Sequence, residues 1–302
     1  MTVLVLMSTY NGARYLREQI DSILAQEGVD IHLLIRDDGS QDDTCFILDE
    51  YATRHDNIEI VKGENVGFVN SFSKLVELAG CYKNPVDYYA FSDQDDIWFP
   101  EKLQTGCHAL SGMNQELPLL FSSNSTFVDE GLHPMGNYHR KNPYRTKENV
   151  MIFPTEQGCS MLFNRKAVNI YNLHHPVASW SDRWMCLICN FMGQLVYCHT
   201  PLFYYRIHSG NALGQHVGVL KHLQIIWKLL ISPKSSNYPM VVEFSHAYGS
   251  LLSKENLAIL DVYLGYKTSY KNKIKLLSSR YQLSLGLWNR LRKLVLLIEN
   301  SL

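Results

Sequence analysis

The chain has 302 residues, of which 46% are hydrophobic, so it can bury a sizeable core and global disorder is not expected. The formal net charge of -1 conceals an asymmetry: residues 1–213 hold 16 Lys and Arg against 25 Asp and Glu, whereas residues 214–302 hold 12 against 4. Carboxylates in the first part can hold a metal ion, and the basic second part can face phosphates or anionic lipid. No run reaches about 20 apolar residues, so no membrane-spanning helix is expected.

The first hundred residues alternate between apolar strands and amphipathic helices. We expect strands at 3–7, 31–35, 58–61 and 88–92, and helices at 14–26, after Asp42 or Asp43, and at 68–78. This alternation predicts right-handed βαβ units and an α/β fold with a doubly wound, mostly parallel sheet flanked by helices. Ligands of such sheets bind beyond the carboxyl ends of the strands. Polar clusters at 8–12, 37–40 and 93–96 all fall at such ends, which places the expected site there.

The composition and hydrophobic pattern of the chain change after about residue 213. Residues 219–231 and 287–298 have apolar residues at helical spacing with Lys and Arg between them, so we interpret 214–302 as a basic, amphipathic helical appendage. The seven Cys have no framework spacing, which indicates a reducing compartment. Cys186 and Cys189 lie in an apolar run without a second ligand pair at zinc spacing, so we expect them in a helix core.

The cluster Asp93-Gln94-Asp95 follows an apolar strand directly. Two carboxylates one residue apart can converge on one hard cation, Mn²⁺ or Mg²⁺, which also binds substrate phosphates. Such neutralisation assists the departure of a diphosphate leaving group. Asp96 is a third carboxylate that can support the site from behind. The alternative is an acidic turn that caps the helix beginning near Pro100.

Three further clusters have a chemical and a structural interpretation each. In the pair Asp37-Asp38, one carboxylate at the strand end can accept from the imide N–H of uracil or thymine, or it can form an Asx-turn or a helix cap. Asp182, between Trp180 and Trp184, can be a partly desolvated base or an N-terminal cap. Arg206 and His208 share a strand face and can meet a diphosphate or a metal, or they can be scattered surface residues.

Taken together, these residues form a family pattern. The sequence resembles the family 2 glycosyltransferases of bacteria, which have the GT-A fold, and especially the branch that builds O-antigens, capsules and rhamnose-containing cell-wall polymers. The matching segments cover about residues 2–213 in the order STYNG, RDDGSQDDT, ENVGFVNSF, FSDQDDIWFPEKL, GCSMLFNRKAV, SDRW and YRIHSGN. The resemblance implies a catalytic domain over 1–213, with a nucleotide-sugar half at about 1–100 and an acceptor half at about 101–213.

The resemblance also implies a role for individual residues. The donor nucleotide sugar is expected to contact Thr9, Tyr10, Asn11, Asp38, Asp93, Gln94 and Arg206. The metal, Mn²⁺ or Mg²⁺, is expected on Asp93 and Asp95 with His208. Asp182 stands in the place of the catalytic base, and Gly158, Cys159 and Trp180 line the acceptor side. This chain departs from the family at Ser181, where a charged residue often precedes the base, and this leaves the tuning of that base open.

The expected activity is inverting, metal-dependent transfer of a sugar from a UDP- or dTDP-sugar to a saccharide or a polyprenyl-diphosphate-linked acceptor in bacterial surface polysaccharide synthesis. Rhamnose is the favoured sugar, while UDP-galactose, UDP-glucose and UDP-N-acetylhexosamines stay open. A cytoplasmic location is expected, with peripheral contact to the inner face of the membrane through 214–302 and no nucleic-acid partner. The alternatives are a non-catalytic nucleotide-sugar-binding subunit of a glycan assembly complex and a nucleotidyltransferase, although the latter needs a glycine-rich basic loop that 8–12 lacks.

Overall fold

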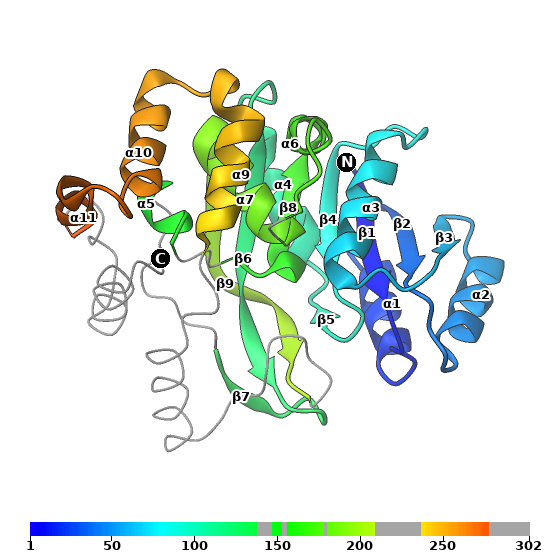
Figure 1. Cartoon of the computed structure of the whole chain (residues 1–302). Coiled ribbons are helices and arrows are strands. Elements are labelled where there is room, and N and C mark those ends of the chain that lie inside the picture. The colour runs from blue at the N-terminus through cyan, green and yellow to red at the C-terminus, as the bar shows by residue number, and fades with distance from the viewer. Residues whose placement is uncertain (138–146, 153–155, 178–179, 209–236, 278–302) are drawn as a thin grey trace, which may run out of the picture.

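The computed structural model describes residues 1–137, 147–152, 156–177, 180–208 and 237–277 (Figure 1). Its centre is a mixed sheet in the order β3-β2-β1-β4-β8-β6-β9-β5, with β7 paired to β6. The strands are β1 (Thr2–Thr9), β2 (Asp30–Asp37), β3 (Ile58–Lys62), β4 (Tyr88–Ser92), β5 (Ile97–Trp98), β6 (Leu119–Val128), β7 (Pro134–Asn137), β8 (Met161–Asn164) and β9 (Gln194–Arg206).

Helices cover the sheet, and the C-terminal helices α9, α10 and α11 lie on the side of the domain away from β3 (Figure 1). They are α1 (Leu16–Leu24), α2 (Thr44–Arg54), α3 (Phe68–Gly80), α4 (Lys102–Ser111), α5 (Lys147–Val150), α6 (Arg165–Tyr171), α7 (Ser181–Met192), α9 (Tyr238–Tyr248), α10 (Lys254–Leu264) and α11 (Tyr270–Leu276). Two short 3-10 turns, η1 (Gly158–Ser160) and η2 (Gly249–Leu251), complete the described elements. None of these helices is long and apolar enough to cross a membrane.

The predicted βαβ half is confirmed. Strands β3, β2, β1 and β4 are parallel neighbours, and the predicted strands and helices of this half lie within a few residues of the observed ones. Residues 3–7 in β1 are fully buried because neighbours cover both faces of the strand. The second half differs from the expected mostly parallel sheet, since β8 pairs antiparallel with both β4 and β6, and only β6 with β9 is parallel there.

Two apolar layers lie on opposite faces of the sheet. Alternate residues of β1 point into different clusters: Leu4 and Leu6 pack toward α3, α6 and α7, while Val3, Val5 and Met7 pack toward α1, α2 and α4. This alternation follows from the two-residue period of a strand. The sheet is therefore clamped between helices, and its functional side chains gather at the carboxyl edge of β1, β2 and β4.

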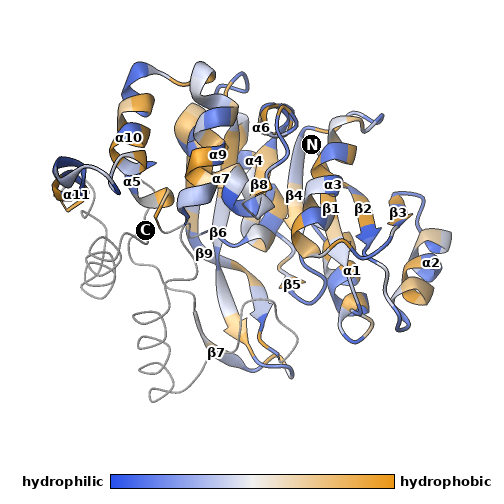
Figure 2. Ribbon diagram, in the orientation of Figure 1, coloured by the Kyte–Doolittle hydropathy of each residue, from blue (hydrophilic) through white to orange (hydrophobic). Residues whose placement is uncertain are grey.

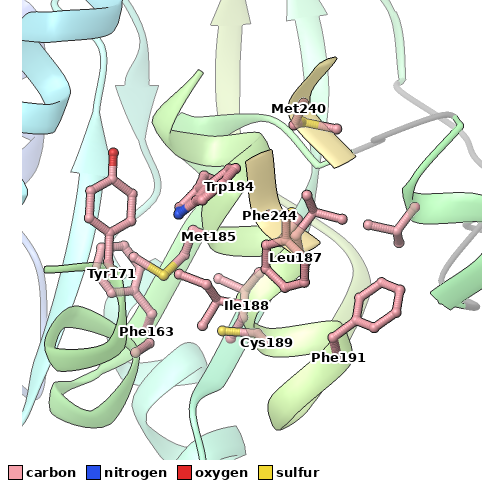
Figure 3. Close-up of a cluster of buried hydrophobic side chains, with 14 of the residues drawn as sticks. Phe163, Tyr171, Trp184, Met185, Leu187, Ile188, Cys189, Phe191, Met240 and Phe244 are labelled. Atoms are coloured by element: carbon pink, nitrogen blue, oxygen red, sulfur yellow. The ribbon is translucent and has the colours of Figure 1, made fainter. Parts of the chain in front are cut away.

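Helices α9 and α10 pack against α7 and share its apolar cluster. Met240 and Phe244 of α9 lie beside Trp184 and Leu187 of α7 (Figure 3), and all four side chains are buried. The indole nitrogen of Trp184 donates to the hydroxyl of Tyr248 at 3.2 Å. The described part of the predicted appendage is thus helical and belongs to the core of the sheet domain. The amphipathic stretches 219–231 and 287–298 lie outside the described residues.

The cysteines of α7 are core residues, as predicted. Cys186 and Cys189 are fully buried, and burial raises the pKa of both thiols above its ordinary value. Both belong to the same apolar cluster as Leu187 and Ile188, and Figure 3 shows Cys189 among these side chains. A protonated, enclosed thiol behaves as a small hydrophobic side chain.

The corner between α7 and β9 generates a stability prediction. A Cβ at Gly193 would lie 1.7 Å from the carbonyl oxygen of Pro118, whereas a Cβ at Gly112, after α4, would meet nothing within 4 Å. We expect Gly193→Ala to lower the free energy of unfolding by about 2 kcal/mol or more, because backbone must shift to admit the methyl group. The matched Gly112→Ala should change it by less than about 0.5 kcal/mol. Urea unfolding measures both, and equal stability of the two variants would contradict the packing at this corner.

Candidate active site

The turn after β2 is built by Asp37. Its carboxylate accepts from the backbone nitrogens of Gly39 (3.1 Å) and Ser40 (2.9 Å) and from the hydroxyl of Thr9 (3.0 Å). Burial alone would raise the pKa of Asp37, but hydrogen bonds outweigh it and lower the pKa, first from the Ser40 hydroxyl (2.6 Å), then from the Ser40 backbone and Thr9. The Asx-turn interpretation therefore applies to Asp37. The hydrogen bond from the Thr9 hydroxyl to Asp37 connects the ends of β1 and β2.

Asp38 joins the end of β2 to the start of α3. Its buried carboxylate forms an ion pair with Arg36 and accepts from the backbone nitrogens of Val66 and Gly67, both at 2.9 Å. Gly67 has φ +80°, a conformation that favours glycine. A carboxylate offers about four lone-pair positions, so one position on Oδ2 is left for a ligand. Contact of Asp38 with a nucleobase stays a prediction.

Tyr10, Asn11 and Gln94 form one surface across the ends of β1 and β4. The Gln94 amide clamps the backbone of Tyr10, accepting from its nitrogen at 2.8 Å and donating to its oxygen at 3.1 Å. Asn11, at φ 48°, accepts from the backbone nitrogen of Gln41 through its side chain. A Cβ at Gly12 would lie 2.2 Å from the Gln94 amide oxygen, so the clamp needs glycine there. The Tyr10 side chain is left exposed and can offer its ring to a base.

Acidic side chains gather directly after β4. Asp93, Asp96 and Cys159 bring one ligand atom each to within 4.8 Å of one another. Asp95 pairs with the imidazole of His208 at 2.8 Å. One carboxylate oxygen of Asp96 is buried without a hydrogen-bond partner among the described residues, so it fits an oxygen-seeking cation. The structure thus places Asp93 with Asp96 and Cys159, and Asp95 with His208. Joint binding of a metal by Asp93, Asp95 and His208 stays a prediction.

Arg206 holds this acidic loop in place. Its side chain is buried, and its guanidinium lies 4.4 Å from the centre of the Tyr15 ring. Its donors are directed to protein groups, which are Asp96 Oδ1 (3.2 Å from the backbone nitrogen), the Asp95 carbonyl (2.9 Å), the Glu130 carbonyl (2.9 Å) and the Glu18 carboxylate. In this conformation the guanidinium binds the protein itself. Its predicted contact with a diphosphate stays a prediction.

The surroundings of the acidic cluster raise the pKa values of its side chains and so favour their protonated forms. Burial, reinforced by the charge of Asp95, raises the pKa of Asp93 to about 7. Burial, with the charges of Asp95 and Asp93, raises the pKa of Asp96 well above its ordinary value. Burial and the adjacent carboxylates also raise the pKa of the Cys159 thiol, so it stays protonated and does not act as a ligand for a hard cation. A divalent cation would relieve the repulsion among these carboxylates.

Lys102 is a buried neighbour of this cluster that sequence reasoning missed. Its ammonium lies 3.5 Å from the centre of the Trp98 ring, and burial lowers its pKa to about 7, a shift that the nearby Asp96 carboxylate opposes. In the segment PEKL this lysine follows a proline-containing turn and has the pattern of a surface helix residue. Only the tertiary structure reveals that its side chain is buried against Trp98. Arg36 was likewise missed, because a charged residue inside an apolar strand has no partner visible in sequence.

Asp182 lies in the first turn of α7, next to the acidic cluster. A Cβ at Gly158 would lie 3.4 Å from the Asp182 Cβ, and Cys159, the next residue, belongs to the acidic cluster. Its carboxylate accepts from the backbone nitrogen of Arg183 at 2.7 Å, whereas the N-cap position of α7 is Trp180, so Asp182 does not take the predicted alternative of an N-terminal cap. Burial raises the pKa of Asp182, opposed by Arg183, which favours a proton-accepting role. The η1 turn therefore links Asp182 to Asp93.

An aromatic group borders Asp182. The Trp180 ring contacts Phe68 of α3 edge-on, with ring centres 5.1 Å apart, and the Arg183 guanidinium lies 4.3 Å from its centre. The hydroxyl of Ser181, beside the base, accepts from Tyr171 at 2.9 Å. Phe68 was not among the predicted site residues, since in sequence it reads as the apolar start of a helix. Roles of Trp180, Gly158 and Cys159 toward an acceptor stay predictions.

Known proteins are similar to this chain over much of its length. Residues 4–170 match the family model described as Glycosyl transferase family 2. A dTDP-rhamnosyl transferase of Shigella flexneri, RfbG, is 36% identical over 224 residues, which cover 70% of this chain and 74% of that protein. An uncharacterized glycosyltransferase of Nostoc sp. is 28% identical over 220 residues, 70% of this chain and 66% of that protein.

Solved structures share the fold at low sequence identity. TarS of S. aureus, solved with UDP-GlcNAc, has a TM-score of 0.60 and 16% identity, covering 95% of this chain and 80% of that one. A mannosyltransferase of Pyrobaculum calidifontis in complex with GDP-Man and Mn2+ has a TM-score of 0.52 and 12% identity, covering 99% and 88%. The mixed sheet and its site edge define a GT-A fold. The chain belongs to glycosyl transferase family 2 and is a glycosyltransferase.

The raised pKa of Asp93 predicts a pH-dependent metal affinity. A cation binds the ionised carboxylate, and with a pKa of about 7 only about one Asp93 in ten is ionised at pH 6. We therefore expect Mn²⁺ to bind roughly tenfold more weakly at pH 6 than at pH 8, because binding must displace this proton. Isothermal titration calorimetry of the nucleotide-free protein measures the change, with Asp93→Asn as the variant that loses this step. A wild-type affinity that does not change between these pH values would contradict the electrostatics described.

Proposed function

We propose that this glycosyltransferase transfers a sugar, with inversion, from a dTDP- or UDP-sugar to a saccharide or polyprenyl-diphosphate-linked acceptor in bacterial surface polysaccharide synthesis. The observation that carries the proposal is the placement of Asp182, whose pKa is raised by burial, beside the acidic cluster of Asp93. A base and a phosphate-binding metal site in contact are what glycosyl transfer from a nucleotide sugar needs.

The donor nucleotide would bind at the edge of β1, β2 and β4. The exposed Tyr10 ring can stack on the base, and the free position on Asp38 can accept an imide N–H of uracil or thymine. Thr9, Asn11 and Gln94 shape this surface through the bonds that fix the two turns. Rhamnose is the favoured sugar because the Shigella relative is named a dTDP-rhamnosyl transferase.

A divalent cation, Mn²⁺ or Mg²⁺, would be held by Asp93 and Asp95 with His208, while Asp96 orients the loop from the buried side. When bound, it would neutralise the charge that develops on the leaving diphosphate. Asp95 and His208 already lie 2.8 Å apart, so these two ligands are positioned before the metal arrives. The P. calidifontis mannosyltransferase, which was solved with Mn2+, is consistent with such a requirement.

Asp182 would remove the proton from the acceptor hydroxyl. Burial raises its pKa, which makes the carboxylate a better base than an exposed one. With Asp93 and Asp95 assigned to the metal, Asp182 is left as a single base, which matches direct displacement and inversion of the anomeric centre. Trp180 and Gly158 border Asp182 and would line the acceptor side. We place this reaction in the cytoplasm, at the inner face of the membrane where a polyprenyl-linked acceptor is presented.

Replacing Asp182 tests the proposal most simply. Asp182→Asn keeps the shape of the side chain but cannot take a proton, so release of nucleoside diphosphate from a panel of dTDP- and UDP-sugars with Mn²⁺ should fall by about 100-fold or more. Affinity for dTDP or UDP, measured by calorimetry, should stay within about threefold of wild type.

The matched control is Asp56→Asn, an exposed carboxylate in the loop before β3, which should leave turnover unchanged. Near wild-type turnover of Asp182→Asn would place the base elsewhere. Binding of nucleotide by the wild type without turnover of any donor in the panel would favour the non-catalytic subunit instead.

A further inference from the structure

Helix α11 carries an exposed face of mixed apolar and basic character. Tyr270 and Ile274, one turn apart, are exposed by 79% and 55%. The exposed Lys271 and Lys275 and the half-buried Lys273 lie between and beside them on the same short helix. We call these five residues the α11 face; Figure 2 shows α11 at the outer end of the described helices, with strongly hydrophilic and hydrophobic residues side by side.

The opposite side of α11 is fixed to the protein. Leu276 is fully buried in the apolar cluster that contains α9 and α10. Ser269 caps the helix by accepting from the backbone nitrogen of Asn272 at 3.3 Å, and the Asn272 side chain donates to the Asp261 carbonyl at 3.5 Å. The orientation of α11 is therefore set from within, and Tyr270 and Ile274 point outward because Leu276 points inward.

The charge pattern specifies the kind of partner. Residues 262–277 contain four Lys and no Asp or Glu. One of these lysines, Lys267, contacts the protein itself, since its ammonium lies 4.0 Å from the centre of the Tyr238 ring. The other three belong to the α11 face and can meet an outside partner. A tyrosine and an isoleucine flanked by lysines match the interface of an anionic bilayer, where apolar side chains enter the acyl boundary and ammonium groups stay at the lipid phosphates.

We propose that the α11 face docks the enzyme on an anionic lipid surface. This inference goes beyond the proposed reaction, since it rests on exposed residues of α11 and on none of the residues of the active site. It gives the expected membrane contact of 214–302 a defined element, separate from 219–231 and 287–298. For a transferase acting on a lipid-linked acceptor, such docking would raise the local concentration of acceptor.

Vesicle flotation of the full chain tests the proposal. Wild-type protein should float with vesicles of phosphatidylglycerol mixed with phosphatidylcholine at low salt, and should do so less in high salt and with pure phosphatidylcholine. Tyr270→Ser with Ile274→Ser, and separately Lys271→Gln with Lys275→Gln, should each lower the partition coefficient by about tenfold. These variants replace exposed residues, so circular dichroism should show an intact fold.

Matched controls use the same chemistry at other places. Leu251→Ser removes an apolar side chain that is also 55% exposed, but in η2 before α10, and Lys83→Gln with Lys254→Gln removes two exposed charges elsewhere. Both controls should bind vesicles as the wild type does. Wild-type protein that fails to bind anionic vesicles at low salt, or α11 variants that bind as well as the wild type or its controls, would overturn the proposal.

The same preparations separate this inference from the proposed reaction. Release of nucleoside diphosphate from soluble donors, measured without vesicles, should be unchanged in the α11 variants. Normal vesicle behaviour with no turnover of any donor would reject the proposed reaction and leave the docking surface standing. Turnover of a donor together with vesicle binding that does not depend on α11 would support the proposed reaction and reject the docking surface.

Discussion

The geometry of the active site depends on one buried cation. Arg206, the last residue of β9, reaches back to α1 and to the loop after β4 and binds a carboxylate, two backbone carbonyls and the Tyr15 ring. Removing a guanidinium from water costs several kcal/mol, and the cost is met here by directing its donors to acceptors. The guanidinium bond to the Asp95 carbonyl, together with the bond from the Arg206 backbone nitrogen to Asp96, ties the loop that carries the acidic side chains to the end of β9.

This restraint explains why the acidic residues tolerate each other. Free carboxylates would separate or become protonated, and the raised pKa values of Asp93 and Asp96 show how unfavourable their common charge is without a cation. The nearest buried amine, Lys102, is itself shifted toward neutrality, with its pKa lowered to about 7, so it compensates the charge incompletely. A cluster of carboxylates that is held together by backbone bonds and is short of positive charge supports the proposal of a divalent cation at this site.

The sequence predicted the first half of the fold because its signals are local. Apolar runs such as 3–7 and polar turns such as 8–12 need no distant partner to be interpreted, and the seven motifs identified the family. The antiparallel insertion of β8 between β4 and β6 could not be predicted, since strand order is set by packing across some 70 residues of chain. The sequence could not distinguish the roles of the adjacent Asp37 and Asp38. In the structure Asp37 forms a turn and Asp38 forms an ion pair with Arg36.

Residues with long-range partners were the ones that sequence interpretation placed least well. Arg206 was expected at a diphosphate and is found binding protein groups, and Lys102 has no local signal of burial. The exposed face of α11 is visible only once Leu276 is seen to point inward, because a seven-residue helix is too short for its periodicity to indicate which side is covered.

The central claim, that Arg206 positions the acidic loop for which metal binding is proposed, is tested most directly by the Mn²⁺ affinity of Arg206→Lys in the absence of nucleotide. Lysine keeps the charge but cannot reproduce the forked set of hydrogen bonds, so the account predicts Mn²⁺ binding weakened by about tenfold or more in a protein that still folds. Calorimetry of wild type and variant, with circular dichroism as the check on folding, measures this. Unchanged Mn²⁺ affinity in Arg206→Lys would contradict the account and return Arg206 to the role of a direct diphosphate ligand.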